Sequence, residues 1–409
     1  MANDKLKKVY DIIYSVFYGD KNYSVVLSEE RTTEKKDDAL VLFLSRGVIE
    51  RKNTLETIIK SKLIKGLRIR PNTRCVLYIG AYLILYANSY RFYAAVSESV
   101  ELSKEVTKDY KTVNFVLREI VRDLENKGYD KDSIRNVSVD VLYPEIKKAI
   151  LEKNNKGQDR NLELLSFIYS VPYELCYLLK DNFGIKTTEL VLKSFLEKKP
   201  VSLVYNSKIT NKEELVAKLD NAHINYSFSC YTDEVILAEG FDLFEDFEPF
   251  KNGMLTVQDF SSYLTSKIAH VSGDEKVLDV CAAPGGKTVG IAKALKAEKK
   301  NGFVISRDIS SAKVNLINEN IARCGLDNVK TEVFDATLLD EKSIEKFDLV
   351  LLDVPCSGIG IIGKKPDIKY NINEQFLDDL VSLQKRIIHN AVQYVKKGGV
   401  LIYSTCTLN

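Results

Sequence analysis

Apolar residues recur at helical spacing along the first 127 residues of the chain. Two clear runs are Val9, Ile12, Ile13, Val16 and Phe17, and then Val113, Val116, Leu117, Ile120 and Val121. Because residues three and four apart share one face of a helix, this spacing predicts amphipathic helices. The stretch 80–86 is apolar on all sides, which is typical of a central helix in a bundle. Residues 1–127 are therefore predicted to form an all-α domain.

The pattern becomes irregular between residues 128 and 198. The first part of this region is charged, and Lys153–Arg160 is expected to be a loop. Residues 161–198 predict further short helices, which proline and glycine interrupt. We therefore expect a helical linker region over 128–198.

A third pattern begins after Pro200. Residues 201–205 predict a strand, residues 212–219 predict a helix, and short strands are expected near 226–238. This mixture predicts a small α+β module over 199–252.

From residue 253 to residue 409, short apolar runs that predict strands alternate with amphipathic stretches that predict helices. The predicted strands are 276–280, 302–306, 331–334, 347–352 and 400–404, and the predicted helices are 287–297, 311–324 and 374–396. Such alternation is typical of a doubly wound parallel sheet with right-handed crossovers. The prediction for the whole chain is therefore multidomain: an all-α domain, a small α+β module, and an α/β Rossmann-like domain.

Composition changes this picture little, but the distribution of charge adds to it. The chain has 409 residues, 45% of them hydrophobic and 28% charged, which is typical of a soluble globular protein. The net charge of +2 says nothing about partners. Eight basic residues against the single acid Glu56 form a local basic field: Arg51, Lys52, Lys60, Lys62, Lys65, Arg68, Arg70 and Arg74. This field could attract phosphates, but a solvated helix face is the simpler interpretation.

Cysteine usage predicts reduced thiols and a cytoplasmic location. The seven cysteines stand at positions 75, 176, 230, 281, 324, 356 and 406, and no two of them have CxxC spacing. With three histidines in the chain, no zinc site is apparent. The N-terminus lacks the apolar core of a signal peptide, and the longest apolar run, Cys75–Ala87, is too short to span a bilayer.

The turn after the first strand of the α/β domain has the composition of a cofactor-binding loop. The strand ends at Asp279, and the loop is Cys281, Ala282, Ala283, Pro284, Gly285, Gly286 and Lys287. Small residues let the backbone approach a ligand, and the following helix offers free amide groups. The loop matches neither GxGxxG nor the complete Walker A pattern.

Acids at three strand ends predict that the ligand is an adenosine-type cofactor. Besides Asp279, they are Asp308 after the second strand, suited to ribose hydroxyls, and Asp335 after the third, near an adenine. Each alone could be a helix cap or turn residue, but three in register favour a cofactor.

Two thiols stand just past predicted buried strands. Cys356 lies in Asp353-Val354-Pro355-Cys356-Ser357-Gly358, and Cys406 lies in Ser404-Thr405-Cys406. Open α/β sheets place their chemistry at such strand ends, so we expect cysteine nucleophilic catalysis. The residues alone do not say which thiol attacks, and buried packing is the alternative for either. The other five cysteines are expected to serve packing.

These motifs, in this order and spacing, resemble the Sun-type family of RNA cytosine methyltransferases. The match extends through Gly253, Val257-Gln258-Asp259 and Ser262, and through Lys364–Lys369. The N-terminal region resembles NusB-like RNA-binding domains at Gly80-Ala81-Tyr82, Glu98 and Val113–Arg118. The combination is similar to the family members that modify 16S ribosomal RNA.

The resemblance implies a fold, a reaction and a set of roles. S-adenosylmethionine would be the cofactor, and carbon 5 of an unstacked cytosine in 16S ribosomal RNA would be the target. Cys406 would attack carbon 6, Cys356 would help to release the product, and Asp353 would hold the ring. Lys287 would lie near the active site, and Lys364, Lys365 and Lys369 could bind phosphates. No membrane or metal is implied, and we expect a monomer.

The chain also departs from the family pattern. The family usually has an arginine a few residues after the strand-two acid, and here Lys313 stands nearest. Arginine is also common in the family where Lys364 and Lys365 stand. Family members continue through a helix and two further strands beyond residue 409, so we expect a C-terminally incomplete sheet with an exposed edge. Transfer RNA or another ribosomal site remains an alternative target, and a non-catalytic RNA-binding or ribosome-assembly protein remains an alternative class.

Overall fold

The computed structural model describes residues 2–19, 21–30, 35–64, 66–152, 159–207, 209–239, 247–297 and 300–409. Most of the predicted loop at Lys153–Arg160 lies outside this part of the chain. The chain divides into two compact units. The helical unit comprises Met1–Glu197, Gly358–Asn373 and Leu408–Asn409, and the sheet unit comprises Lys198–Ser357 and Glu374–Thr407. The finer domain boundaries expected from the sequence stay predictions.

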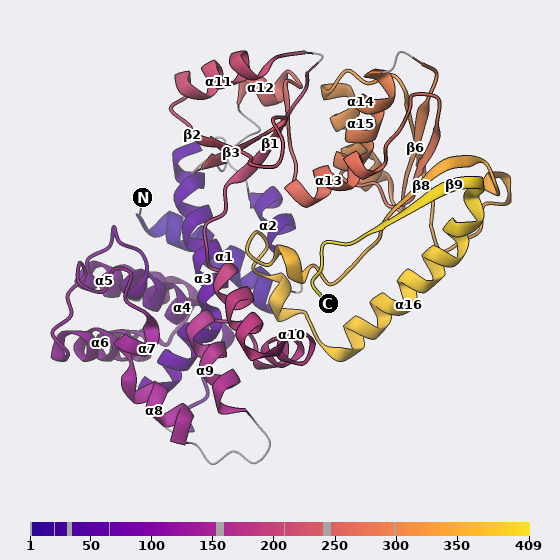
Figure 1. Ribbon diagram of the computed structural model, residues 1–409. Coiled ribbons are helices and arrows are strands. Elements are labelled where there is room, and N and C mark those ends of the chain that lie inside the picture. Colours follow the sequence, from indigo (N-terminus) through magenta and orange to yellow (C-terminus); the bar gives the residue numbers. More distant parts are fainter. Residues whose placement is uncertain are drawn as a thin grey trace. The chain divides into compact units, whose positions relative to one another are not determined.

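The helical unit is all-α, as the periodicity predicts (Figure 1). Its helices are α1 (Ala2–Tyr18), α2 (Tyr23–Glu30), α3 (Lys35–Lys62), α4 (Pro71–Leu85), α5 (Phe92–Val106), α6 (Tyr110–Asn126), α7 (Val139–Leu142), α8 (Pro144–Glu152), α9 (Arg160–Tyr169) and α10 (Tyr173–Ser194).

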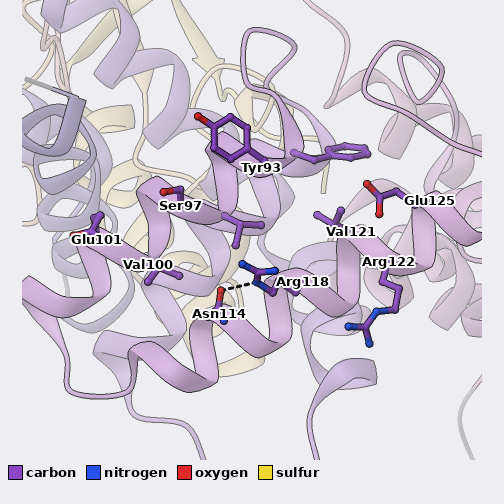
Figure 2. Close-up of a pocket in the computed structure, with 11 residues that line it drawn as sticks. Tyr93, Ser97, Val100, Glu101, Asn114, Arg118, Val121, Arg122 and Glu125 are labelled. Carbon is purple, nitrogen blue, oxygen red and sulfur yellow. Dashed lines mark hydrogen bonds between the residues drawn. The ribbon is translucent and has the colours of Figure 1, made fainter.

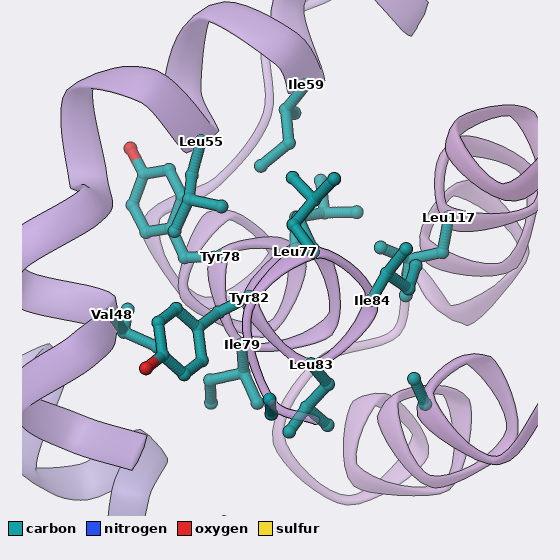
Figure 3. Packing of buried hydrophobic residues seen from close by; sticks show 14 of the residues in the cluster. Val48, Leu55, Ile59, Leu77, Tyr78, Ile79, Tyr82, Leu83, Ile84 and Leu117 are labelled. Carbon is teal, nitrogen blue, oxygen red and sulfur yellow. The ribbon is translucent and has the colours of Figure 1, made fainter. Parts of the chain in front are cut away.

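Helix α4 is the centre of this unit, as its uniform apolarity predicts. Nearly every residue of α4 is buried, and the helix packs against α1, α3, α5 and α6. Figure 3 shows Tyr78 and Tyr82 beside Val48 and Leu55, with Ile84 facing Leu117. This burial removes most of the apolar surface of α4 from water, which stabilises the unit.

A second core of the helical unit surrounds α9 and α10. It includes Leu162, Leu175, Cys176, Leu179 and Leu192, together with Ile359 and Ile362 from the returning segment 358–373. Among the described residues, no single helix has the length and apolarity needed to cross a membrane; α9 and α10 pass that test only as a pair, which is bent by 115°.

The sheet unit contains two separate sheets. The first is antiparallel with the order β2-β3-β1-β4, formed by β1 (Val201–Tyr205), β2 (Asn225–Phe228), β3 (Val235–Glu239) and β4 (Leu255–Val257). Helices α11 (Lys212–Asn221) and α12 (Glu248–Lys251) accompany it. Leu203, Leu215 and Leu255 lie in its core. The predicted strands and helix of this module are confirmed.

The second sheet is parallel throughout, with the order β7-β6-β5-β8-β9. Its strands are β5 (Lys276–Asp279), β6 (Phe303–Asp308), β7 (Val329–Val333), β8 (Phe347–Asp353) and β9 (Val395–Ser404). Its helices are α13 (Phe260–Ile268), α14 (Gly286–Ala297), α15 (Ser311–Arg323) and α16 (Glu374–Ala391). This arrangement confirms the Rossmann-like fold prediction.

Both faces of the parallel sheet are covered by helices. Alternate residues of a strand point to opposite faces. Accordingly, Val350 and Leu352 of β8 join a cluster with Ile387 of α16, whereas Leu349 and Leu351 join one with Leu295 of α14. Burial on both faces explains why these strands are continuous apolar runs rather than alternating ones.

The predicted end of the chain needs correction. The last helix ends at Ala391 rather than 396, and β9 begins at Val395 rather than 400. After Val395, β9 continues with Lys-Lys-Gly-Gly, which lack apolar side chains, and Gly398 has φ 80° beside a register shift against β8. The strand continues through this irregularity without a hydrophobic signal in the sequence.

Candidate active site

The candidate site lies at the carboxyl ends of the parallel strands. β5 is the first strand of this sheet in sequence and lies in its middle, between β6 and β8. Successive connections leave such a point in opposite directions, which opens a crevice for ligands. The loop after β5, the acid after β6 and the motif after β8 all border this point.

The predicted cofactor loop joins β5 to α14 and is fixed by its neighbours. The Ala282 amide donates to the Arg307 carbonyl at 2.9 Å, and the Ala283 amide donates to the Asp308 carboxylate at 2.9 Å. A Cβ on Gly285, which has φ 103°, would lie 3.3 Å from Ile317 Cα. Glycine is therefore required there for both conformation and space.

The rest of the loop is equally restrained. The Asn320 side chain donates to the Pro284 carbonyl at 2.9 Å. Gly286 begins α14, so the first amide groups of that helix have no partner within it and can bind a ligand. Cys281 is half-buried, and burial raises the pKa of its thiol to about 12, so it is a weak candidate for chemistry.

Asp308, the predicted ribose-binding acid, is nearly buried at the end of β6. Besides the Ala283 amide, it accepts the Ile309 amide at 2.8 Å and pairs with Lys313 at 3.2 Å. Lys313 thus neutralises Asp308. A carboxylate accepts about four hydrogen bonds, so Asp308 retains room for a hydroxyl.

Asp335, the predicted adenine-side acid, follows β7. It accepts hydrogen bonds from the amide and hydroxyl of Thr337 at 2.9 and 2.8 Å, and these bonds lower the pKa of Asp335. Asp335 therefore has the geometry of a turn residue, the alternative that its sequence position allowed. Its contact with a cofactor stays a prediction.

Asp279 is fully buried and only half satisfied. Its Oδ2 accepts the Thr288 hydroxyl at 2.7 Å, and Thr288 Oγ1 lies 2.8 Å from the Ser306 hydroxyl. Its Oδ1 has no partner in the structure. Burial raises the pKa of Asp279 to about 7, with a smaller contribution from Asp353. An orphaned carboxylate oxygen beside a ligand loop suits a cationic group on the ligand.

Asp353 connects the cofactor loop to the two thiol motifs. Its Oδ2 accepts the Lys287 ammonium at 2.6 Å, and its Oδ1 accepts the Ser404 hydroxyl at 2.8 Å. Lys287 is mostly buried, so the pair is little screened by solvent. The structure therefore brings together Lys287 of α14, Asp353 of β8 and Ser404 of β9.

The two predicted thiols are direct neighbours. Cys356 Sγ and Cys406 Sγ are 3.2 Å apart, and the next residues, Ser357 and Thr407, join through their hydroxyls at 2.5 Å. The hydrogen bond to Cys356 and then partial burial raise the pKa of Cys406 above that of an ordinary thiol. Packing is not the role of Cys406, because this residue is exposed.

The other cysteines divide in two groups. Cys75, Cys176 and Cys324 are buried, as expected for packing. Cys230 is exposed in the turn between β2 and β3, so the packing expected of it is wrong. The sequence around Cys230 is polar on one side and aromatic on the other, which did not distinguish a turn from a core.

The basic residues expected to meet RNA need a second correction. Lys364 and Lys365 are exposed, but Lys369 is buried and donates to the Glu50 carbonyl at 2.7 Å. Burial lowers the pKa of Lys369 to about 7. Lys369 therefore cannot contact phosphates, because its ammonium is enclosed by the helical unit.

The basic field of residues 51–74 is also smaller than the count suggests. Arg51 stacks on Tyr86, Lys52 lies over Phe17, and Lys62 pairs with Asp123. Lys60 pairs with Glu56 at 2.9 Å. Arg68 and Arg70 are exposed, whereas Lys65 lies outside the described residues.

Sequence reasoning gave no role to Thr288, Ser306, Gln258 and Ser404. Thr288 follows Lys287 directly, and a Cβ on Gly286 would lie 3.6 Å from the Gln258 amide nitrogen. The signal for Ser404 and Ser306 was a small polar residue at a strand that is otherwise apolar. The role of such a residue can be recognised only when the register of the strand is known.

The described residues contain no cluster of three or more His, Cys, Asp and Glu side chains able to hold a metal ion. A pocket of about 490 Å³ lies in the helical unit between α5 and α6. Figure 2 shows Tyr93, Ser97 and Val100 facing Arg118 and Val121 across it. Acids and bases line it in equal number, namely Glu101, Glu125, Arg118 and Arg122, and none of the predicted site residues does.

Comparison with known proteins gives two family matches. Residues 267–409 match the family described as 16S rRNA methyltransferase RsmB/F. Residues 7–122 match the NusB family. The two matches cover the parallel sheet and the bundle around α4, respectively.

Individual relatives agree with this. Ribosomal RNA small subunit methyltransferase B of Shewanella oneidensis is 27% identical over 404 residues, which are 97% of this chain and 84% of the relative. Ribosomal RNA small subunit methyltransferase F of Escherichia coli O157:H7 is 36% identical over 160 residues, which are 39% of this chain and 33% of the relative. The crystal structure of PH0851 covers 98% of this chain and 86% of its own, with 22% identity and a TM-score of 0.71, and so shares the fold.

Proposed function

We propose that this chain, whose residues 267–409 belong to the RsmB/F family of 16S rRNA methyltransferases and whose residues 7–122 belong to the NusB family, methylates carbon 5 of a cytosine in 16S ribosomal RNA. The reaction would proceed through a covalent bond between a cysteine and the RNA. One observation carries this proposal: two thiols 3.2 Å apart at the crevice of the sheet, beside the Lys287–Asp353 pair. A cofactor-binding fold without cysteine chemistry has no need of both thiols at one place.

S-adenosylmethionine is the methyl donor of this family, and the residues present fit it. The cofactor carries a sulfonium and an ammonium, and the crevice is bordered by the acids Asp279, Asp308 and Asp353. The buried Asp279 Oδ1 without a partner marks a place where a cation is favoured. The loop Cys281–Lys287, with Asp308 and Asp335, would hold the cofactor, which supplies an electrophilic methyl group when bound.

Cytosine carbon 5 needs activation before it can accept that methyl group. The thiolate of Cys406 would bond to carbon 6, which makes carbon 5 nucleophilic. Asp353, held by Lys287 and Ser404, would orient the ring at nitrogen 3 and the exocyclic amine. After methylation a base would remove the proton of carbon 5, and the electron pair of that C–H bond would re-form the carbon 5–carbon 6 double bond. The Cys406–carbon 6 bond would then break to return the Cys406 thiolate, and Cys356 would assist this release.

The target base must leave its stack to reach these groups, so we infer single-stranded or loop RNA as substrate. The exposed Lys364 and Lys365 could bind the flanking phosphates. The work of such an enzyme on ribosomal RNA implies the cytoplasm, and we propose that it acts as a monomer.

The test is methyl transfer from labelled S-adenosylmethionine to unmodified 16S RNA. Wild-type protein should label the RNA at a cytosine, and Cys406→Ala should lose transfer while still binding the cofactor. Cys356→Ala should accumulate a denaturant-resistant adduct between protein and RNA. Folded wild-type protein that binds RNA but transfers no label and forms no adduct would instead indicate a binding protein. Label in transfer RNA but not in 16S RNA would change the target and keep the chemistry.

A further inference from the structure

The chain leaves the sheet unit directly after the Cys356 motif. Residues Gly358–Asn373 belong to the helical unit, and the chain returns to the sheet unit at Glu374, where α16 begins. We call residues 358–373 the docked segment. It contains two short 3-10 helices, η3 (Ile359–Ile361) and η4 (Ile368–Tyr370). Cys356 is thus two residues from a segment that folds with another part of the chain.

Apolar anchors fix the near end of the docked segment. Ile359 and Ile362 are fully buried in the core around α9 and α10, with Leu175 and Leu179. Gly358 has φ 71°, and a Cβ on it would lie 3.0 Å from Ile368 Cδ1. The backbone that leaves Cys356 is therefore packed against the segment that follows it.

Polar anchors fix the far end. Asp367 is buried, and its carboxylate accepts the Tyr23 amide at 3.0 Å, at the N-terminus of α2. A carboxylate at a helix N-terminus is stabilised by the free amides and the helix dipole. The Arg46 guanidinium of α3 donates to the Gly363 carbonyl at 2.6 Å.

Backbone carbonyls of helix α3 also accept two hydrogen bonds from side chains of the docked segment. Lys369 donates its ammonium to the Glu50 carbonyl, and Tyr370 donates its hydroxyl to the Ile49 carbonyl, both at 2.7 Å. Lys52 lies 4.4 Å from the centre of the Tyr370 ring. Burial of an ammonium is costly unless it is hydrogen-bonded, so these contacts define one docked position.

The other side of the Cys356 loop is fixed within the sheet unit. Ser357 joins Thr407 at 2.5 Å, and Gln384 of α16 donates to the Pro355 carbonyl at 2.8 Å. The Cys356 loop is therefore restrained by sheet-unit contacts on one side, and on the other side it continues directly into a segment that folds with the helical unit. Loss of either set of contacts removes restraints from the backbone around Cys356.

We propose that the docked segment positions the Cys356 thiol for product release, with Asp367 and Arg46 as positioning residues that act through the segment. This inference rests on the proposed function, because it takes Cys406 as the attacking thiol and Cys356 as the thiol of release. Neither positioning residue touches the substrate. The attack step depends on Cys406, Asp353 and Lys287, which the docked segment does not contain.

Loosening the segment therefore affects release more than attack. Asp367→Ala and Arg46→Ala should form the protein–RNA adduct at close to the wild-type single-turnover rate. Their multiple-turnover kcat should fall about tenfold or more, because small misplacements of a reacting group cost large factors in rate. The adduct should accumulate during turnover, as in Cys356→Ala. Asp367→Asn keeps an oxygen acceptor for the Tyr23 amide and should be milder than Asp367→Ala.

Thr73→Ala is the matched control. It removes a partly buried hydrogen bond from Thr73 to Asp109, at 2.7 Å, elsewhere in the helical unit. It should lower thermal stability without adduct accumulation. Thermal unfolding and cofactor binding, measured for each variant, identify any variant that fails to fold. Arg46→Ala leaves the buried apolar contacts of the segment in place, so it still tests the proposal if Asp367→Ala does not fold.

An equal fall of single-turnover and multiple-turnover rates, or a fall of kcat without adduct, would overturn the positioning role. Adduct accumulation in Thr73→Ala to the same level would overturn it too, because the effect would then follow from stability alone. If Cys356→Ala itself forms no adduct, the proposed function fails rather than this inference. The two failures are therefore distinguishable.

Discussion

The reactivity of Cys406 depends on its neighbour. In the structure the Cys356 hydrogen bond is the largest cause that raises the pKa of Cys406, followed by burial. The thiolate is the nucleophile, so at neutral pH the wild-type Cys406 is mostly in its unreactive form. The first effect of removing Cys356 should therefore be on the acidity of Cys406 rather than on the fold.

We predict that Cys356→Ala lowers the pKa of Cys406 and makes it more reactive near pH 7.5. The rate of Cys406 alkylation by iodoacetamide, measured from pH 6 to 10 and assigned by peptide mass, should rise at lower pH than in the wild type. The control is Cys230, which is exposed and remote in sequence, and whose rate should not change. Identical Cys406 profiles in both proteins would contradict the contact between the thiols.

Asp279 gives a prediction about how the stability of the protein depends on pH. Its pKa in the folded protein is raised to about 7, whereas an unfolded aspartate has a pKa of about 3.9. The folded state thus holds the proton more tightly, and the resulting stabilisation is present below pH 4 and lost as the pH rises through 7. At most about 4 kcal/mol is involved, at 1.36 kcal/mol per pKa unit.

Asp279→Asn cannot ionise and keeps an oxygen acceptor for Thr288. We therefore expect its free energy of unfolding, relative to wild type, to increase between about pH 4 and pH 7 and then level off. Denaturant titrations at several pH values without cofactor measure this difference. A difference that is constant across the range would mean that Asp279 ionises normally.

Many residues of this site could be predicted from the sequence. The contacts that could not be predicted were missed for one reason. Acids and thiols at strand ends were recognisable because parallel strands bring their carboxyl ends to one edge. The pairing of Lys287 with Asp353 and the burial of Lys369 depend on contacts between distant parts of the chain. A charge in a local sequence window gives no sign of whether its environment is solvent or a protein carbonyl.

Within the sheet unit, Gly253 lies in close contact with the end of α15. Gly253, between α12 and β4, has φ 68°, and a Cβ there would lie 2.0 Å from the Arg323 carbonyl at the end of α15. Arg323 also donates to the carbonyls of Phe250 and Leu255 at 3.0 and 2.9 Å. This contact therefore joins the antiparallel sheet to the parallel one.

We predict that Gly253→Ala destabilises the protein far more than Gly325→Ala. Both positions have a positive φ, which costs an alanine about 1–2 kcal/mol, but nothing lies within 4 Å of a Cβ at Gly325. At Gly253 backbone atoms must also move, which adds about 1–3 kcal/mol. Chemical denaturation of both variants gives the comparison, and equal losses would mean that only conformation matters.

Periodicity predicts elements well where one face is buried and poorly elsewhere. The apolar α4 and the runs of β5 and β8 were recognisable because burial decides their side chains. The beginning of β9 was not, since Lys396–Gly399 carry no apolar side chain and lie at the register shift between the Phe347–Val395 and Leu349–Val400 pairs. For the same reason, turns such as that of Asp335 appear in the sequence only as polar residues.

At the scale of the whole molecule, sequence order and spatial grouping differ. The docked segment lies between two motifs of the parallel-sheet domain, and its lysines Lys364, Lys365 and Lys369 were expected to bind phosphates. It instead shares its core with residues up to 197. Contacts between residues more than 300 positions apart leave no periodic trace in the chain, so local patterns could not find them.

This grouping predicts how the molecule opens. Amides of the docked segment should exchange with deuterium together with α3, not with the neighbouring β8 and α16.

Leu44→Ala, in the fully buried core of the helical unit, should lower that unit's stability by about 2–5 kcal/mol. It should thereby speed exchange at residues 359–370 while leaving β5 and β8 unchanged. Leu295→Ala, the matched change in the sheet unit, should do the reverse. Native-state exchange read by mass spectrometry separates these outcomes. If Leu295→Ala, rather than Leu44→Ala, speeds exchange at residues 359–370, the segment is stabilised by the sheet unit. It would then have no role in linking Cys356 to the helical unit.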